Sequence, residues 1–197
     1  MDHTMRTEIE ASKPRRGLLA VMAVVCLTIY LFEMERPAVA QSEGDWGIFQ
    51  TLIGTWIGEG AGFGDVSDIT HEWSPVVSGQ FLRLQTRSVQ RQGGEVHEDI
   101  GLLSRDRETD SFVFRQFLSE GYVVTYDVGV EKAGEPAGSP EGSLIVFRFR
   151  EAESTGGMQA RMRLTFVGND QYEMVLELAA PGGEFAPCQQ MHFSKVP

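Results

Sequence analysis

The most regular feature of the chain is a two-residue alternation of apolar and polar side chains in its C-terminal part. The apolar side chains of Met162, Leu164 and Phe166 alternate with arginine and threonine, and residues 171–180 continue the pattern with tyrosine, methionine and leucine against glutamate. This period is typical of β-strands that have one face in a core and the other in water.

The same patterning, interrupted by Gly, Pro, Asn, Asp and Ser at turns, fills most of the chain after residue 53. One short segment differs, because the apolar residues around 46–52 are spaced for one or two helical turns. The glycine-rich stretch 134–142 is interpreted as a loop. The strands predicted are 54–62, 67–75, 80–91, 96–106, 111–118, 122–131, 143–150, 160–168, 171–180 and 188–196.

The order of these elements favours a closed barrel. The predicted strands follow one another through short turns, and no long amphipathic helix is available to cover a sheet. Closure buries the apolar face and removes the sheet edges. We therefore predict an all-β fold: one antiparallel up-and-down β-barrel of about ten strands with a short N-terminal helical segment.

The first 40 residues predict an export signal. A basic segment at 13–16 precedes an apolar run at 17–32, and Ala38-Val39-Ala40 forms a small-x-small cleavage pattern before Gln41. The prediction is a signal peptide over 1–40 and a barrel domain over 41–197, in the periplasm or outside the cell. The alternative is an uncleaved leader that anchors the protein in the membrane.

Charge and cysteine content narrow the choice of partners. The net charge is −11, and because residues 1–40 carry equal numbers of acidic and basic side chains, all of it lies in 41–197. Nucleic acid and, after leader cleavage, membranes are therefore not expected as partners. Only Cys188 lies beyond the leader, so the domain has no internal disulfide. No oligomeric state follows from these patterns.

The start of the predicted barrel carries a short motif. Residues 54–60 read GTWIGEG, which resembles the GxW start of calycin barrels such as lipocalins and fatty-acid-binding proteins. It resembles still more the GxWxGxG start of nitrobindin-like haem-binding barrels and of a related bacterial family of unknown function, whose second and third strands residues 72–88 also resemble. The resemblance extends over residues 46–197 and implies a calycin-like barrel.

The motif also has a physical interpretation. A tryptophan at the start of the first strand can plug the closed end of a barrel, and alternate glycines permit the bend that closure requires. Trp56, Gly54, Gly58 and Gly60 are therefore assigned structural roles.

The nitrobindin resemblance implies a haem whose iron is bound by a histidine in the last strand, where this chain has His192. Strand alternation, however, places Met191 and Phe193 on the apolar face and His192 on the opposite one. Haem is the one cofactor considered, and none is predicted from the residues themselves.

Other candidates for ligand contact lie within the predicted strands. His71 and Trp73 share a face that can point inwards, whereas His97, beside a Gly-Gly turn, is expected to be solvated. An inward arginine could bind a carboxylate, although exposed cross-strand pairs with Asp and Glu are the alternative. The arginines in question are Arg83, Arg115, Arg148 and Arg163.

No catalytic motif stands out. The leading hypothesis is an exported, non-catalytic barrel that binds a small hydrophobic ligand, such as a lipid, in its interior. One alternative, implied by the resemblance, is a haem barrel acting on nitric oxide or peroxynitrite. The other is a barrel with a filled interior that serves as an interaction module.

Export predicts that the mature protein begins at Gln41, because the Ala-Val-Ala pattern ends at Ala40. N-terminal sequencing of protein recovered from the expressing cells checks this. An intact leader in membrane-extracted protein would favour the anchor instead.

Overall fold

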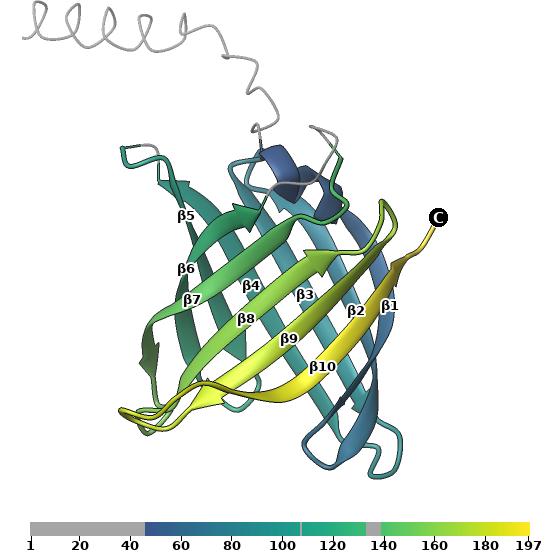
Figure 1. Cartoon of the computed structure of the whole chain (residues 1–197), viewed down its shortest axis with the longest axis vertical. Helices are drawn as coiled ribbons and strands as arrows, with labels where there is room; N and C mark the ends of the chain where they lie inside the picture. Colours follow the sequence, from purple (N-terminus) through teal and green to yellow (C-terminus); the bar gives the residue numbers. More distant parts are fainter. Residues whose placement is uncertain (1–45, 107, 133–138) are drawn as a thin grey trace, which may run out of the picture. The chain divides into compact units, whose positions relative to one another are not determined.

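A computed structural model describes residues 46–106, 108–132 and 139–197. The predicted leader, 1–40, lies outside these residues. The described chain forms one short 3₁₀ helix and ten strands (Figure 1). They are η1 (Gly47–Leu52), β1 (Gly54–Gly62), β2 (Asp65–Val76), β3 (Phe81–Gln90), β4 (Val96–Asp106), β5 (Ser111–Leu118), β6 (Val123–Lys132), β7 (Leu144–Glu153), β8 (Gln159–Phe166), β9 (Gln171–Ala179) and β10 (Ala186–Lys195).

The ten strands form a closed barrel. Each strand pairs antiparallel with the next along the chain, and β1 closes the sheet against β10 in a register from Trp56–Lys195 to Gly62–Gln189. The predicted fold class is confirmed, since the strands are consecutive, antiparallel and closed, and a short helical segment precedes them. No helix of the described residues is long and apolar enough to cross a membrane.

The alternation read from the sequence defines the inside of the barrel. On β8, Met162, Leu164 and Phe166 are buried, and on β9 so are Tyr172 and Met174. These side chains join a single apolar cluster.

One end of the barrel is plugged. η1 lies across this end in Figure 1, and its Phe49 and Leu52 are buried. Trp56, at the start of β1, is fully buried, and its indole Nε1 donates a 2.7 Å hydrogen bond to the carbonyl oxygen of Leu52. Its ring lies 4.6 Å from that of Tyr172, centre to centre. A large aromatic side chain thus ties the helix, the first strand and β9 together.

Glycine permits the close approach of β1 and β10. A Cβ atom on Gly58 would lie 2.2 Å from the carbonyl oxygen of His192 and 2.7 Å from a ring carbon of Phe193. Gly54, with a φ of +126°, has a backbone conformation that favours glycine. On Gly60 a Cβ would come within 2.8 Å of side chains inside the barrel. The glycines of the motif therefore lie where side chains would obstruct the seam.

Replacing Trp56 should be costly if the side chain plugs the barrel. We expect Trp56→Ala to lower the free energy of unfolding by about 3–5 kcal/mol, because a large buried aromatic leaves a cavity that collapses incompletely. Urea denaturation measures the change. The control is Ile57→Ala, the next residue on β1, which is 57% exposed and should cost less than about 1 kcal/mol. Equal effects of the two substitutions would contradict the structural role of Trp56.

Candidate functional site

The barrel encloses a cavity of about 510 Å³. Its wall includes residues of the hairpin turns after β1, β3, β5 and β7, among them Phe63, Glu95, Glu120 and Met158. These turns lie at the end opposite η1 (Figure 1). The cavity therefore belongs to the half of the barrel away from the plug, and the interior is not completely filled.

Most of the cavity wall is apolar. Apolar atoms contribute most of its surface. The ring of Phe114 lies directly over Gly101 of β4, where a Cβ atom would come within 2.0 Å of the ring. The apolar lining residues at the barrel centre are Ile69, Trp73, Leu84, Phe114, Phe147, Met162, Met174 and Met191.

The turns around the cavity expose large apolar side chains to solvent. Phe63 is 63% exposed, and Tyr122 and Met158 are each 40% exposed. All three also line the cavity. An apolar molecule that approaches this end therefore meets apolar side chains before it reaches the interior.

A row of polar side chains crosses three neighbouring strands inside the barrel. His71 on β2 is the register partner of Thr86 on β3, which is in turn the partner of Asp99 on β4. All three are buried and line the cavity. The register therefore places an imidazole, a hydroxyl and a carboxylate side by side in the cavity wall.

His71 lies on the plugged side of this row. Its Nδ1 shares a 2.7 Å hydrogen bond with the Tyr172 hydroxyl, and its ring stacks on Phe193 at 4.2 Å. Burial lowers the pKa of His71 to about 4, because desolvation disfavours the charged imidazolium. His71 is therefore neutral at neutral pH, and the Tyr172 hydroxyl, whose pKa burial raises well above 10, keeps its proton.

Nearer the cavity mouth, His97 lies between two carboxylates. Its Nδ1 is 2.6 Å from Oε1 of Glu120, and its Nε2 is 3.6 Å from Oδ2 of Asp99. The pKa of His97 is raised to about 9, first by Asp99 and then by Glu120. Asp99 has the larger effect although it lies farther away, since its side chain is only 4% exposed against 46% for Glu120 and is less screened by water. At neutral pH His97 is a cation paired with two acids.

Asp99 has one oxygen without a partner. Its Oδ2 faces His97, but its Oδ1 is buried and accepts no hydrogen bond from the described residues. The carboxylate also acts electrostatically on His71, where it opposes the larger effect of burial. Burial first, and then the charge of Asp99, raise the pKa of Tyr126 well above its usual range. Asp99 thus affects the pKa of two other side chains that line the cavity.

Of the residues proposed from the sequence, His71 and Trp73 line the cavity. The inward arginine is not observed. Arg115, Arg148 and Arg163 are exposed, and Arg83 lies between the buried residues Leu82 and Leu84, on the outer side of β3.

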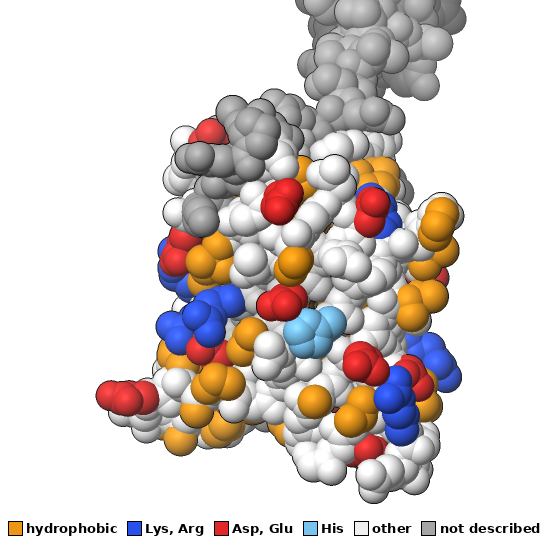
Figure 2. Space-filling view, turned by 45° about the vertical axis from the view of Figure 1, so that its right-hand side comes forward, with side chains coloured by type: hydrophobic (Ala, Val, Ile, Leu, Met, Phe, Trp, Pro, Cys, Tyr) orange, Lys and Arg blue, Asp and Glu red, His pale blue; other side chains and the backbone are white. Residues whose placement is uncertain are grey.

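The outer arginines face acidic partners where the structure shows one. Arg148 pairs with Glu131 at 2.5 Å, and Arg163 lies 3.4 Å from Glu177. Figure 2 shows charged side chains of both signs, interspersed with single hydrophobic ones, on one face of the barrel. The prediction of an arginine that binds a carboxylate inside the barrel is therefore wrong, and exposed cross-strand pairing is the correct alternative for Arg148 and Arg163.

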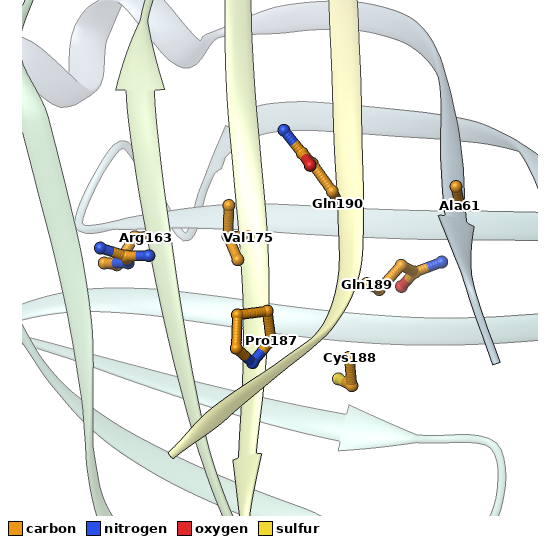
Figure 3. A pocket seen from close by; sticks show the side chains of 7 residues that line it. All are labelled: Ala61, Arg163, Val175, Pro187, Cys188, Gln189 and Gln190. Carbon is orange, nitrogen blue, oxygen red and sulfur yellow. The ribbon is translucent and has the colours of Figure 1, made fainter.

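Arg163 also lines a second pocket, beside the β-bulge that shifts the register of β10 between Pro187 and Gln189 (Figure 3). This pocket lies among outward side chains of β8, β9 and β10, such as Val175 and Gln190. It is separate from the polar row inside the barrel.

His192 points away from the cavity. Its side chain is 54% exposed, and its Nδ1 lies 3.3 Å from Oε1 of Glu173. This imidazole could not bind a haem iron inside the barrel. His192 is therefore not placed to act as the haem ligand that the nitrobindin resemblance implies. The two histidines that do line the cavity have other partners, Tyr172 for His71 and two carboxylates for His97. The described residues therefore fit a haem poorly.

The sequence patterns did not predict the most polar part of the site. His97, expected to be solvated, has a side chain only 34% exposed in the cavity wall, and Asp99 is buried beside it. Alternation along β4 did not predict that His97 and Asp99 face inwards, because the apolar residues Val96 and Ile100 lie on the outer face, where they are 46% and 47% exposed. Among the described residues no three His, Cys, Asp or Glu side chains converge closely enough to hold a metal ion.

No family model matches the chain, and no curated protein matches it either. Among solved structures, that of Rv2717c from M. tuberculosis has 14% identity, covers 76% of this chain and 98% of its own, and has a TM-score of 0.59. A phycobiliprotein lyase, CPES from Guillardia theta, has 11% identity, with 82% and 99% covered and a TM-score of 0.46. A de novo designed fluorescence-activating β-barrel has 13% identity, with 76% and 98% covered and a TM-score of 0.38.

The similarity to Rv2717c shows a shared fold and carries no function across. Together with the closed ten-strand topology, it establishes that this chain has a calycin-like barrel fold.

The charge of His97 should appear in the pH dependence of stability. Its pKa in the folded protein, about 9, exceeds the value of about 6.5 expected in the unfolded chain. The stabilisation is therefore complete below about pH 6.5 and is lost as the pH rises through about 9. We expect the difference in urea midpoint between wild type and His97→Gln to shrink between about pH 6 and pH 10. His192→Gln, which removes an imidazole from the outer face, should keep the wild-type pH dependence. If the difference in urea midpoint between wild type and His97→Gln stayed the same over this pH range, the ion pairs of His97 with Asp99 and Glu120 would be contradicted.

Proposed function

We propose that this protein is an exported, non-catalytic binding protein that holds a small apolar ligand inside its barrel. The observation that carries the proposal is the cavity of about 510 Å³ with its largely apolar wall. Ligand-binding pockets commonly have volumes of roughly 300–1,000 Å³ and a few polar groups in an apolar lining. Here His71, Thr86 and Asp99 are polar groups of this kind in the cavity wall.

The contrast between the two ends of the barrel supports the proposal. At the plugged end, Trp56, Leu82, Leu103 and Ile145 are fully buried and the interior is packed. A barrel that served only as a rigid interaction module would gain stability from the same packing throughout, because unfilled space in a core is destabilising. The open half is instead lined by apolar side chains with space between them, an arrangement that suits an apolar guest.

The exposed side chains at the mouth support a route for such a ligand. Phe63, Tyr122 and Met158 present apolar surface both to solvent and to the cavity. Each methylene group that a ligand transfers from water to the interior contributes about 0.8 kcal/mol. A molecule with several such groups would therefore partition into the barrel without a covalent or metal link.

The proposal predicts that filling the cavity weakens binding. Thr86→Trp places an indole inside the barrel, whereas Gln85→Trp, the matched control, places the same side chain on the exposed outer face of β3. With the uncharged fluorophore N-phenyl-1-naphthylamine, we expect saturable enhancement for wild type and Gln85→Trp. Thr86→Trp should bind at least about tenfold more weakly, since the indole occupies the space of the probe.

Thermal denaturation of both variants verifies that they are folded. Equal binding by all three proteins would place the probe outside the cavity and contradict the proposal, as would the absence of saturable binding to the wild type.

A further inference from the structure

The cavity wall carries an excess of acid. Glu95, Asp99 and Glu120 all line it, and no arginine or lysine is among the described residues that do so. Among the described residues of this wall, the one cation is His97, which lies between Asp99 and Glu120. Two carboxylates against one imidazole, with Glu95 in addition, give the site an excess of acidic side chains.

Asp99 marks where a ligand would meet this charge. Its side chain is 4% exposed, and Oδ1 has no hydrogen-bond partner in the described structure. A buried carboxylate oxygen that has lost water without gaining a donor is energetically costly. The carboxylate belongs to the cavity wall, so a donor on a molecule bound in the cavity would be placed beside it.

The surroundings of Asp99 define the rest of the ligand. Its register partner Thr86 offers a hydroxyl on one side, and the apolar side chains of Trp73, Phe114 and Met174 line the same cavity. A ligand that fits has an apolar body and one polar group. A carboxylate is the wrong polar group, because it would meet Asp99 and Glu120 without an arginine to offset them.

We propose that the cavity binds apolar amines, with the protonated amino group of the ligand donating a hydrogen bond to the carboxylate of Asp99 and the apolar part lying among the aromatic and methionine side chains. This inference rests on the proposed function and names the chemical class of its ligand. A charged donor suits the site better than a neutral one, since it also compensates the net negative charge.

Three probes with the same alkyl chain test the class of ligand: decylamine, decanol and decanoate. Isothermal titration of the purified protein near pH 7, below the micellar concentration of each probe, compares the head groups. The amine is then protonated and the acid ionised. We expect decylamine to bind about tenfold more tightly than decanol, and decanoate to bind most weakly.

Two substitutions test the partner. Asp99→Asn removes the buried charge, and Glu98→Gln, the matched control, removes one charge from the neighbouring, 65% exposed side chain on the outer face of β4. Asp99→Asn should reduce decylamine affinity to that of decanol and change decanol affinity less than about twofold. Glu98→Gln should leave both affinities within about twofold of wild type.

The outcomes separate the two proposals. Binding of all three probes with equal affinity, or tightest binding of decanoate, would overturn the amine class and leave an apolar-ligand barrel standing. Failure of every probe to bind would overturn both. Unchanged decylamine binding by Asp99→Asn would overturn the role of Asp99. Should this variant fail to fold, the order of the three probes on the wild type still decides the class of ligand.

Discussion

The close approach of β1 to β10 is the contact on which the barrel depends. A β-sheet has two edges unless its first and last strands pair with each other. Here β1 pairs with β10, and the inward positions of β1 beside β10 include Gly58 and Gly60. No side chain could stand at Gly58, because the carbonyl oxygen of His192 and the ring of Phe193 occupy that space. The seam brings Phe193 against His71 and Tyr172, so closure also assembles the aromatic layer between plug and cavity.

The same inward face produces a packed end and a hollow end, through the size of its side chains. Near η1 the inward positions hold bulky residues such as Trp56 and Phe166, which fill the interior. Towards the other end, the inward positions of β1, β2 and β3 include Gly60, Ser67 and Ser88, which are too small to reach the centre. The small inward side chains of these strands therefore leave space that the bulky ones fill at the plugged end.

Much of this architecture could be predicted from the sequence. Period-2 alternation identified the ten strands, and on β8 and β9 it also gave the correct inward face, because most of the apolar residues there lie on one side. The inference failed on β4. In that strand the residues of the inward face include His97 and Asp99, while Val96 and Ile100 face outwards, so hydrophobicity alone points to the wrong side.

The arginines illustrate the same limit. Arg148 and Arg163 stand among apolar residues in the sequence, and whether such a residue faces in or out follows from the parity of its strand. That parity was available from the buried neighbours, such as Met162 and Leu164 beside Arg163. The pairing of His71, Thr86 and Asp99 was not available, because it depends on the register between three strands, to which turn lengths and bulges contribute.

A polar row inside an apolar barrel weakens the fold unless something compensates it. His71 is held neutral by burial, and its hydrogen bond to Tyr172 satisfies one ring nitrogen. His97 offsets part of the charge of Asp99, but the longer of its two contacts, 3.6 Å, is the one to Asp99. Isosteric apolar residues at such positions are often neutral or stabilising, so stability alone does not account for a buried acid with an unpaired oxygen. The proposed ligand would account for it, because Asp99 lies in the wall of the cavity and a donor group on such a ligand would supply the missing partner.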